Sequence, residues 1–475
     1  MEILKTLFIL LEVLLLFNLI IVVHELGHFL AARWRGLKVE KFAVWFGKPL
    51  WSKTIGGVEY RLGCIPAGGF VSIPQLAPME AVEGKTESAA EELPLAKPID
   101  KIIVAAAGPI FSLGLAITFA LIIWVIGRPV SEGETTTTIG YVLAEGPAAK
   151  AGLQPGDRIL SVNGNPVSRF SGMGNVEQSI VWNVARSEAP MIPIEFERNG
   201  QAQTVWVEPT LAARQGWSRK NLRQIAIAPA QTPMIAKIIS DSPAAAAGLK
   251  PRDLVLAING QKLLSLPALA EYLNSYSGGP VTLTIQRDGR KFDQIVEPAV
   301  PVDGTKPRIG IEWDDRGVTT IAHPDPVSQI VTSAQTMWAT LTAIASPKSD
   351  IKIEHLSGPV GIMRLYYLIF EAPDGWRVAL WFSVIFNVNL AILNLLPLPV
   401  LDGGHITLSL IEIIRRRPLD IRVVGVIQNA FALILIGFFI YVTFFDVVDL
   451  TKSGPKEAAP QTLRFMNAPG GGNSP

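Results

Sequence analysis

Cysteine and charged residues are scarce in this chain of 475 residues. Cys64 is the only cysteine, so the chain can form neither an intramolecular disulfide nor a zinc cage built from thiolates. Charged residues make up 17% of the sequence and hydrophobic residues 49%, whereas soluble globular domains contain about 25% charged residues. The composition therefore argues against a purely soluble protein.

The chain also lacks an excess of charge of either sign. It has 42 Lys and Arg against 41 Asp and Glu, a net charge of +1, which gives no electrostatic reason to expect a nucleic acid partner. The 41 glycines and 35 prolines, together with long polar stretches, argue against a protein wholly buried in a membrane. The length allows roughly three domains.

Four apolar stretches, residues 7–32, 102–126, 378–398 and 423–445, are long enough to cross a membrane. A helix rises 1.5 Å per residue and the hydrocarbon layer is about 30 Å thick. The first stretch is too long for the apolar core of a signal peptide, and no small-residue cleavage site follows it. The sequence therefore predicts four transmembrane helices.

Lysines and arginines near the ends of these stretches predict their orientation. Basic residues follow the first stretch, precede the second and lie between the third and the fourth, and such loops usually face the cytoplasm. We therefore expect residues 36–100 and 401–422 on the cytoplasmic side. The N-terminus, residues 128–376 and the C-terminal tail then lie on the opposite side, and the Pro- and Gly-rich tail, 447–475, is expected to be disordered.

The first apolar stretch contains His24-Glu25-Leu26-Gly27-His28. Ionisable groups are costly inside a membrane and usually functional. Positions i and i+4 share one helix face, so His24 and His28 can hold one zinc ion, with Glu25 beside them as a general base. Two histidines need a third protein ligand.

The end of the third stretch supplies candidates for that ligand. Asn394-Leu-Leu-Pro397-Leu-Pro399-Val-Leu-Asp402-Gly-Gly-His405 places a carboxylate after two prolines that interrupt a helix. The broken backbone can present Asp402 toward the metal, and His405 is the alternative. Of the two, we favour Asp402.

These motifs together resemble the site-2 protease family of intramembrane zinc metalloproteases, and in particular the RseP type, which carries tandem PDZ domains. The resemblance implies zinc (Zn2+) ligation by His24, His28 and Asp402, and general base catalysis by Glu25. It also implies substrate handling by Asn389 and Asn394, and we group Pro397 and Pro399 with them in the substrate-binding part of the site. The chain departs from the family at Ser112, where an asparagine is usual.

An internal repeat lies between the second and third apolar stretches. The segment from Pro147 to Gly164 recurs from Pro243 to Gly260 with 11 of 18 positions identical. Each copy predicts a short helix, a turn, an alternating strand and an Asn-Gly turn. The copies resemble PDZ domains, which bind peptide C-termini by strand addition. Peptide capture and passive steric gating remain equal alternatives.

The expected fold class is a polytopic α-helical membrane protein with four transmembrane helices, a cytoplasmic-side membrane-associated β-hairpin or sheet, and two extracytoplasmic PDZ domains of α+β type. The expected segments, in chain order, are 1–35 (first membrane helix), 36–100 (β region), 101–127 (second helix), 128–215 and 216–303 (PDZ domains), 304–376 (amphipathic region), 377–400 (third helix), 401–422 (loop), 423–446 (fourth helix) and 447–475 (tail).

The resemblance implies a multi-pass protein of the bacterial inner membrane, in contact with lipid, that cleaves transmembrane proteins after a prior protease has trimmed them. An anti-sigma factor and remnant signal peptides are the substrates it suggests. The alternatives are a PDZ-bearing membrane scaffold with a structural zinc site and a zinc transporter. Glu25 argues against the scaffold, because a structural site has no use for a carboxylate beside its ligands. A transporter would need a chain of ligands across the membrane.

Overall fold

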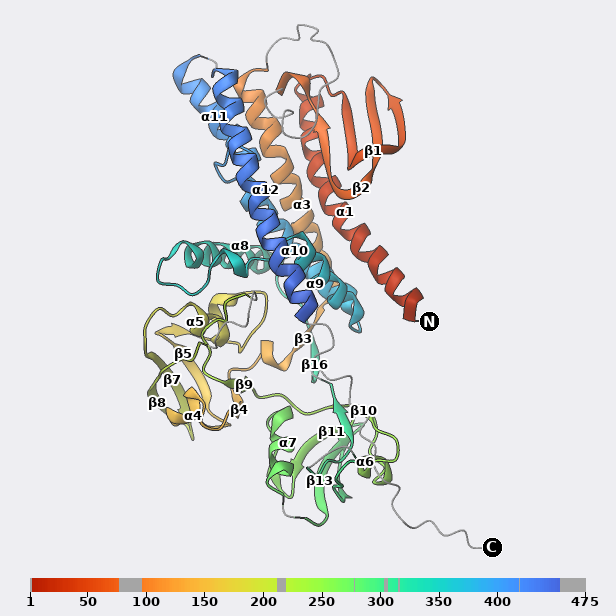
Figure 1. Ribbon diagram of the computed structural model, residues 1–475, viewed down its shortest axis with the longest axis vertical. Helices are drawn as coiled ribbons and strands as arrows, with labels where there is room; N and C mark the ends of the chain where they lie inside the picture. Colours follow the sequence, from red (N-terminus) through yellow and green to blue (C-terminus); the bar gives the residue numbers. More distant parts are fainter. Residues whose placement is uncertain are drawn as a thin grey trace, which may run out of the picture. The chain divides into compact units, whose positions relative to one another are not determined.

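The computed structural model describes residues 2–76, 96–211, 219–276, 278–302, 306–314, 317–417 and 419–452. The chain divides into two compact units, each drawn from separate stretches of sequence (Figure 1). We call them the membrane unit and the repeat unit. The membrane unit comprises Met1–Arg128, His323–Trp338 and Leu356–Val447, and the repeat unit comprises Pro129–Ala322, Ala339–His355 and Val448–Pro475.

Four helices of the membrane unit are long and apolar enough to cross a membrane, as the sequence predicts. α3 lies among its neighbours and packs against α1, α10 and α11. Buried apolar residues of α3, Ala116 and Phe119 among them, meet Val384 and Val388 of α10. The four helices are α1 (Glu2–Trp34), α3 (Pro98–Ile126), α10 (Gly375–Asn394) and α12 (Ile421–Lys452).

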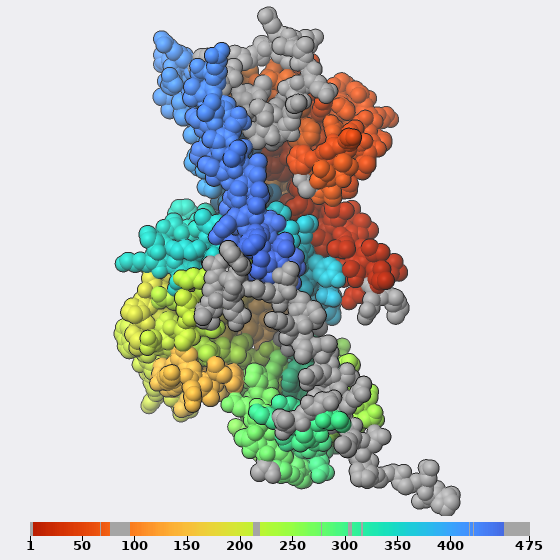
Figure 2. Space-filling view, in the orientation of Figure 1, coloured from red at the N-terminus to blue at the C-terminus, as the bar shows by residue number. Residues whose placement is uncertain are grey.

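α12 exposes apolar side chains along its length, as expected of a helix that faces lipid. Leu433 is 76% exposed and Ile440 66%, and α12 lies on the surface of the membrane unit in Figure 2. The helix continues to Lys452. Residues 447–452, which were expected to belong to a disordered tail, are therefore helical, and the rest of that segment, from residue 453 onward, lies outside the described part of the chain.

A small antiparallel sheet follows α1. It is formed by β1 (Lys41–Ile55) and β2 (Val58–Ser72), and residues 41–44 pair on one side with 59–62 and on the other with 69–72. Residues 51–55 pair with 58–62, so each strand folds back to give four rows, and 69–72 is an edge row. The sheet predicted within 36–100 is present, whereas residues 77–95 of that segment lie outside the described ranges.

Contacts with α1 fix the position of this sheet. Phe29 and Ala32 of α1 share one buried core with Val58 and Val71 of the sheet. Nearer the N-terminus of α1, Asn18 accepts a hydrogen bond from the indole N–H of Trp45. The sheet thus packs along the half of α1 that carries the two histidines.

The third apolar stretch breaks where the prolines predict a break. α10 ends at Asn394, a few residues before the expected end of the span, and α11 (Asp402–Arg415) begins at Asp402. Pro397 and Pro399 lie in the reversal between them. The reversal is so tight that a Cβ on Gly404 would lie 2.1 Å from the carbonyl oxygen of Leu398.

Two shorter helices lie between the repeat region and α10. They are α8 (Pro326–Ala345) and α9 (Pro359–Glu371), within the expected amphipathic region. The carboxylate of Asp446, on α12, accepts hydrogen bonds from the backbone N–H groups of Gly358 and Gly361 at 3.0 and 2.8 Å. An anion at a helix N-terminus is favourable, so this contact ties α12 to α9.

The repeat unit contains two domains of the same topology, as the internal repeat predicts. The sheet order β6-β5-β7-β8 in the first matches β12-β11-β13-β14 in the second, and the pair β4-β9 matches β10-β15. The strands of the first domain are β4 (Ile139–Val142), β5 (Arg158–Val162), β6 (Asn165–Pro166), β7 (Ile192–Arg198), β8 (Gln201–Val207) and β9 (Ile227–Pro229). Those of the second are β10 (Ile235–Ile238), β11 (Leu254–Ile258), β12 (Gln261–Lys262), β13 (Val281–Arg287), β14 (Arg290–Val296) and β15 (Ile311–Trp313).

Short helices complete the two domains. A further pair of strands joins the two ends of the segment that contains both domains. β3 (Arg128–Ser131) pairs with β16 (Thr319–Ala322), so the chain enters and leaves the region through adjacent strands. The short helices are α4 (Pro147–Lys150), α5 (Ile180–Arg186), α6 (Pro243–Ala246) and α7 (Leu266–Asn274).

The two hydrophobic cores place the domain boundaries later than the expected 215/216 and 303. Ile225 belongs to the first core, and Ile309 belongs to the second, with Trp313 packed against it. The reason is that the last strand of each domain pairs with the first, β9 with β4 and β15 with β10. β9 and β15 are short and lie far from the repeated motif, so the alternation of their residues does not reveal from the sequence which domain they belong to.

Each domain also contains the same buried ion pair. Asp157 and Asp253 occupy equivalent positions of the repeat, and each is 1% exposed. Arg198 donates two hydrogen bonds to Asp157 at 2.6 and 2.7 Å, and Arg287 donates two to Asp253 at 2.6 Å. Such bidentate pairs satisfy a buried carboxylate.

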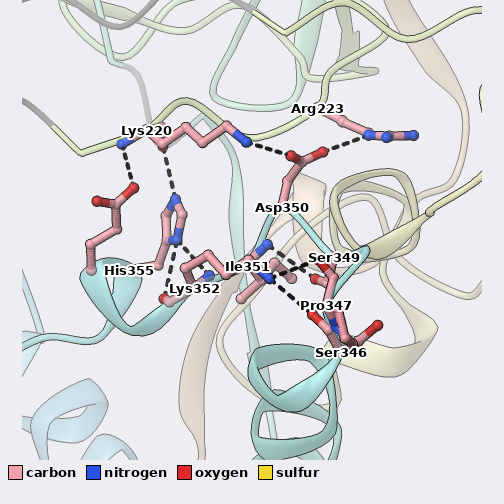
Figure 3. A network of polar contacts seen from close by, with 10 residues as sticks. Lys220, Arg223, Ser346, Pro347, Ser349, Asp350, Ile351, Lys352 and His355 are labelled. Carbon is pink, nitrogen blue, oxygen red and sulfur yellow. Dashed lines mark hydrogen bonds and ion pairs between the residues drawn. The ribbon is translucent and has the colours of Figure 1, made fainter.

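A cluster of charged residues, which we call the Asp350 clasp, joins two further parts of the repeat unit. Lys220 and Arg223 each donate a hydrogen bond of 2.7 Å to the carboxylate of Asp350 (Figure 3). The imidazole of His355 donates from Nε2 to the carbonyl of Lys220 at 2.8 Å. The clasp thus fixes the segment that precedes β9 against the segment between α8 and α9.

Candidate metal centre

His24 and His28 lie on one face of α1, as their spacing predicts. Both are largely buried, at 9% and 7% exposure, and their Nε2 atoms are 3.2 Å apart. Two ring nitrogens that face each other at this distance are poorly satisfied by one another alone, because at most one can donate. The pair is suited to share a cation.

Asp402 brings a carboxylate to the same point from α11. Its Oδ2 lies 3.4 Å from His24 Nε2, and its Oδ1 lies 3.5 Å from His28 Nε2. Oδ2 is buried and has no hydrogen-bond partner. A buried carboxylate oxygen without a partner is costly, and a metal ion would remove that cost.

The spacing of these three side chains fits zinc. For zinc–ligand bonds of about 2.0–2.2 Å, tetrahedral geometry separates the ligand atoms by about 3.3–3.6 Å. The two Nε2 atoms are 3.2 Å apart, and each lies within 3.5 Å of one carboxylate oxygen of Asp402, Oδ2 for His24 and Oδ1 for His28, close to the separations that such a tetrahedron requires. Two imidazoles and one carboxylate also form a donor set typical of catalytic zinc, with a fourth position free.

Both histidines are held by hydrogen bonds through their other ring nitrogen. Nδ1 of His28 donates to the backbone carbonyl of Val104 at 2.8 Å, and Nδ1 of His24 lies 3.0 Å from Oγ of Ser112. Such outer contacts orient a metal-binding imidazole. From the sequence, Ser112 is evident only as a departure from the family pattern. The signal available was its spacing, because 104, 108 and 112 share one face of a helix.

Gly108 lies between these two contacts, on the same face of α3. A Cβ at this position would lie 2.2 Å from Nε2 of His28 and 2.8 Å from Nε2 of His24. Gly27 on α1 allows an equally close approach, since a Cβ there would lie 2.4 Å from the carbonyl oxygen of Ala107. The two glycines therefore let α1 and α3 meet where the histidines lie.

Glu25 follows His24 on α1 and lies beside the sheet. A Cβ on Gly69, in the edge row of β2, would lie 3.3 Å from Cγ of Glu25. The edge of the sheet thus passes next to this carboxylate. A peptide paired with that edge would be extended within reach of Glu25.

The remaining predicted site residues lie at the end of α10 and in the reversal after it. Asn389 has a buried Oδ1 without a hydrogen-bond partner, and Asn394 is the last residue of α10. Pro397 and Pro399 follow in the reversal that leads to Asp402. His405 is on the first turn of α11, three residues after Asp402, and does not belong to the group of ligand atoms that lie within 4.8 Å of one another.

Comparison with known proteins agrees with this site. The model of peptidase family M50 matches residues 12–438. The chain belongs to peptidase family M50. A Neisseria meningitidis protein named as a candidate zinc metalloprotease is 31% identical over 91% of this chain and 97% of its own length.

Two further matches are a relative that is similar over most of the chain and a solved domain that is similar to a smaller part of it. The regulator of sigma-E protease RseP of Salmonella typhimurium is 28% identical over 86% of this chain and 91% of its own length. A solved PDZ domain of an SdrC-like protein from Listeria monocytogenes is similar to 18% of this chain, with 22% identity, a TM-score of 0.17 and 90% of its own length covered.

The M50 membership and the four apolar helices identify this peptidase as an integral inner-membrane zinc metalloprotease. They agree with intramembrane proteolysis, the activity that the sequence motifs predict. The family names imply zinc, and the donor set described above fits that ion.

Proposed function

We propose that His24, His28 and Asp402 hold the catalytic zinc and that Glu25 is the general base. The observation that carries this proposal is the convergence of the three side chains, whose ligand atoms lie within 4.8 Å of one another, as the ligands of one zinc ion must. When bound, zinc would supply Lewis acidity to the carbonyl of the scissile bond. Of the two candidate third ligands, Asp402 supplies the unpaired buried oxygen.

Glu25 takes a proton from the attacking water and passes it to the leaving amine. A peptide bond in a helix is shielded, so the substrate must unwind before it reaches Glu25. The edge row of β2 beside Glu25 can hold the unwound segment by strand addition. Asn389 and Asn394 can donate side-chain hydrogen bonds to the extended backbone, at the point where the two prolines end α10.

The substrates we propose are transmembrane segments of proteins that another protease has already trimmed on their outer side. The name of the Salmonella relative, a regulator of sigma-E protease, suggests an anti-sigma factor. Remnant signal peptides are the other substrate class that the resemblance suggests. Both are short outside the membrane.

The two repeat domains are proposed to be PDZ domains that select substrates on the extracytoplasmic side. Their shared topology and the repeated motif support this assignment, as does the basic character of the loops on the other side of the spans. The domains would exclude substrates with bulky outer parts, or capture a new C-terminus exposed by the first cleavage.

Replacing Glu25 with Gln tests the catalytic assignment. The variant should retain zinc, because the ligands are unchanged, and should lose cleavage of a short transmembrane model substrate by about 100-fold or more. Zinc per purified protein and the cleavage rate are measured together in detergent. Full cleavage by the zinc-loaded variant would reject Glu25 as the general base, whereas a zinc-loaded wild type that cleaves nothing would make a scaffold with a structural zinc site the better account.

A further inference from the structure

Ser112 is a fully buried hydroxyl on a membrane-spanning helix, at 0% exposure. Its Oγ lies 3.0 Å from Nδ1 of His24. A polar side chain at this depth is costly unless it is hydrogen-bonded. The hydroxyl of Ser112 therefore needs a hydrogen-bond partner, and the imidazole of His24 lies within reach.

One face of α3 contacts both histidines. Val104, Gly108 and Ser112 are spaced by four residues, so they form one row on α3. The row runs antiparallel to His24 and His28 on α1: Ser112 meets His24, Val104 meets His28, and Gly108 provides the space between. One of the two imidazoles is held by backbone and the other by a side chain.

The direction of the hydrogen bond at Ser112 follows from the metal. If Nε2 of His24 binds zinc, that nitrogen carries no proton, so the neutral ring has its proton on Nδ1. Nδ1 then donates and Oγ of Ser112 accepts. The opposite tautomer would place a proton on Nε2, where it would point at Asp402 and His28 and exclude the metal.

We infer that Ser112 is a positioning residue for zinc, which fixes the tautomer and ring orientation of His24. The inference rests on the proposed ligand set. The equivalent contact of His28 uses a backbone carbonyl, which no substitution removes. Of the two hydrogen bonds to the histidines, only the one from His24 to Ser112 can thus be removed by mutation.

The test is to measure zinc affinity, by competition with a chromogenic chelator, for the full-length protein and its variants in detergent. Loss of such an outer contact typically lowers metal affinity 10- to 100-fold, so we expect that loss for Ser112→Ala. The visible absorption spectrum of the cobalt-substituted protein should also change, because the orientation of the His24 ring changes. Both readouts are independent of activity.

Ser112→Thr and Ser112→Val form a matched pair of nearly equal volume, of which only Thr keeps the hydroxyl. Thr should bind zinc within about threefold of wild type and Val should lose affinity as Ala does, so the comparison holds even if Ser112→Ala does not fold. Ser383→Ala is the control. Ser383 is also a fully buried helical serine, but its hydroxyl contacts Tyr366 and Ala379, so its loss should leave zinc affinity unchanged.

The inference is overturned if Ser112→Ala or Ser112→Val binds zinc as tightly as wild type while His24→Ala loses zinc. That result would keep the ligand set and assign Ser112 to packing alone. Wild-type zinc affinity in His24→Ala would instead reject the ligand set itself, and the role of Ser112 with it.

Discussion

Gly108 on α3 packs directly against His28 on α1, so closely that a Cβ on residue 108 would lie 2.2 Å from the imidazole Nε2. This approach is closer than any ordinary carbon–nitrogen contact. A side chain at position 108 and a metal ion between the histidines would therefore compete for the same space.

Gly108→Ala should consequently weaken zinc binding. Overpacking a close contact costs about 1–3 kcal/mol, which corresponds to a loss of roughly 5- to 150-fold in zinc affinity. Gly114→Ala is the matched control, because a Cβ at Gly114, on the same helix, would meet nothing within 4 Å. Equal zinc affinity in both variants, measured by chelator competition, would contradict the geometry.

Asp402 and His405 can be separated by single substitutions. Asp402→Ala should reduce both zinc content and activity, because it removes the carboxylate that faces His24 and His28. We expect an activity loss of at least about 100-fold. His405→Ala should keep its zinc. Metal content of the purified variants decides the matter, and full occupancy in Asp402→Ala with loss in His405→Ala would make His405 the third ligand.

Removing the two repeat domains should relax selection without affecting chemistry. The variant to test lacks residues 136–316, which a short Gly/Ser linker replaces. It keeps β3 and β16, the two strands that pair at the ends of the region. The deleted enzyme should cut a short model helix at the wild-type rate. It should also cut an untrimmed substrate, which we expect the full-length enzyme to reject.

The measurement compares cleavage of long and trimmed forms of one substrate by the two enzymes, in detergent and in membranes. Zinc content serves as the control for an intact site. A deleted enzyme that still rejects the long form while it cuts the trimmed one would place the gate in another part of the protein.

The Asp350 clasp should make the repeat unit sensitive to acid. Burial alone would raise the pKa of Asp350, but the hydrogen bonds from Lys220 and Arg223 outweigh it and hold the pKa below its ordinary value of 3.8. A carboxyl whose pKa is lowered on folding contributes stability above its unfolded pKa, and that stability is lost as the pH falls through the folded pKa. The clasp should therefore be intact at neutral pH, its contribution to stability should begin to fall below about pH 4, and that contribution should be lost as the pH falls through the lowered pKa of Asp350.

Asp350→Asn should increase amide hydrogen exchange in residues 219–224 and 346–355 by about fivefold at pH 7, since a hydrogen bond to a charged group contributes roughly 1 kcal/mol or more. The difference from wild type should shrink as the pH is lowered below about 4, because the carboxyl group of the wild type then takes up its proton. Lys237→Gln is the control, because Lys237 is 68% exposed in its pair with Glu312, and exposed pairs contribute little. A difference between Asp350→Asn and wild type that persists unchanged at pH 3 would contradict this account.

The local chemistry of the site was readable from the sequence because it depends on short spacings. The four-residue spacing from His24 to His28 determines that both share a helix face, whatever surrounds that helix. Pro397 and Pro399 end a helix through their own ring geometry, and the structure bears out the break between Asn394 and Asp402. The repeat likewise predicted two domains of one topology.

The contacts of the site were decided only by tertiary structure. Asp402 is far from His24 in sequence and reaches it because α11 packs on α3 beside α1. The roles of Ser112 and Gly108 follow from the antiparallel packing of α3 against α1. The membership of β9 and β15 in the two repeat domains follows from their pairing with β4 and β10, the first strands of those domains. The physical reason is common to all of them: periodicity along the chain fixes which face a residue occupies, whereas the group it meets depends on packing between segments that the sequence does not place together.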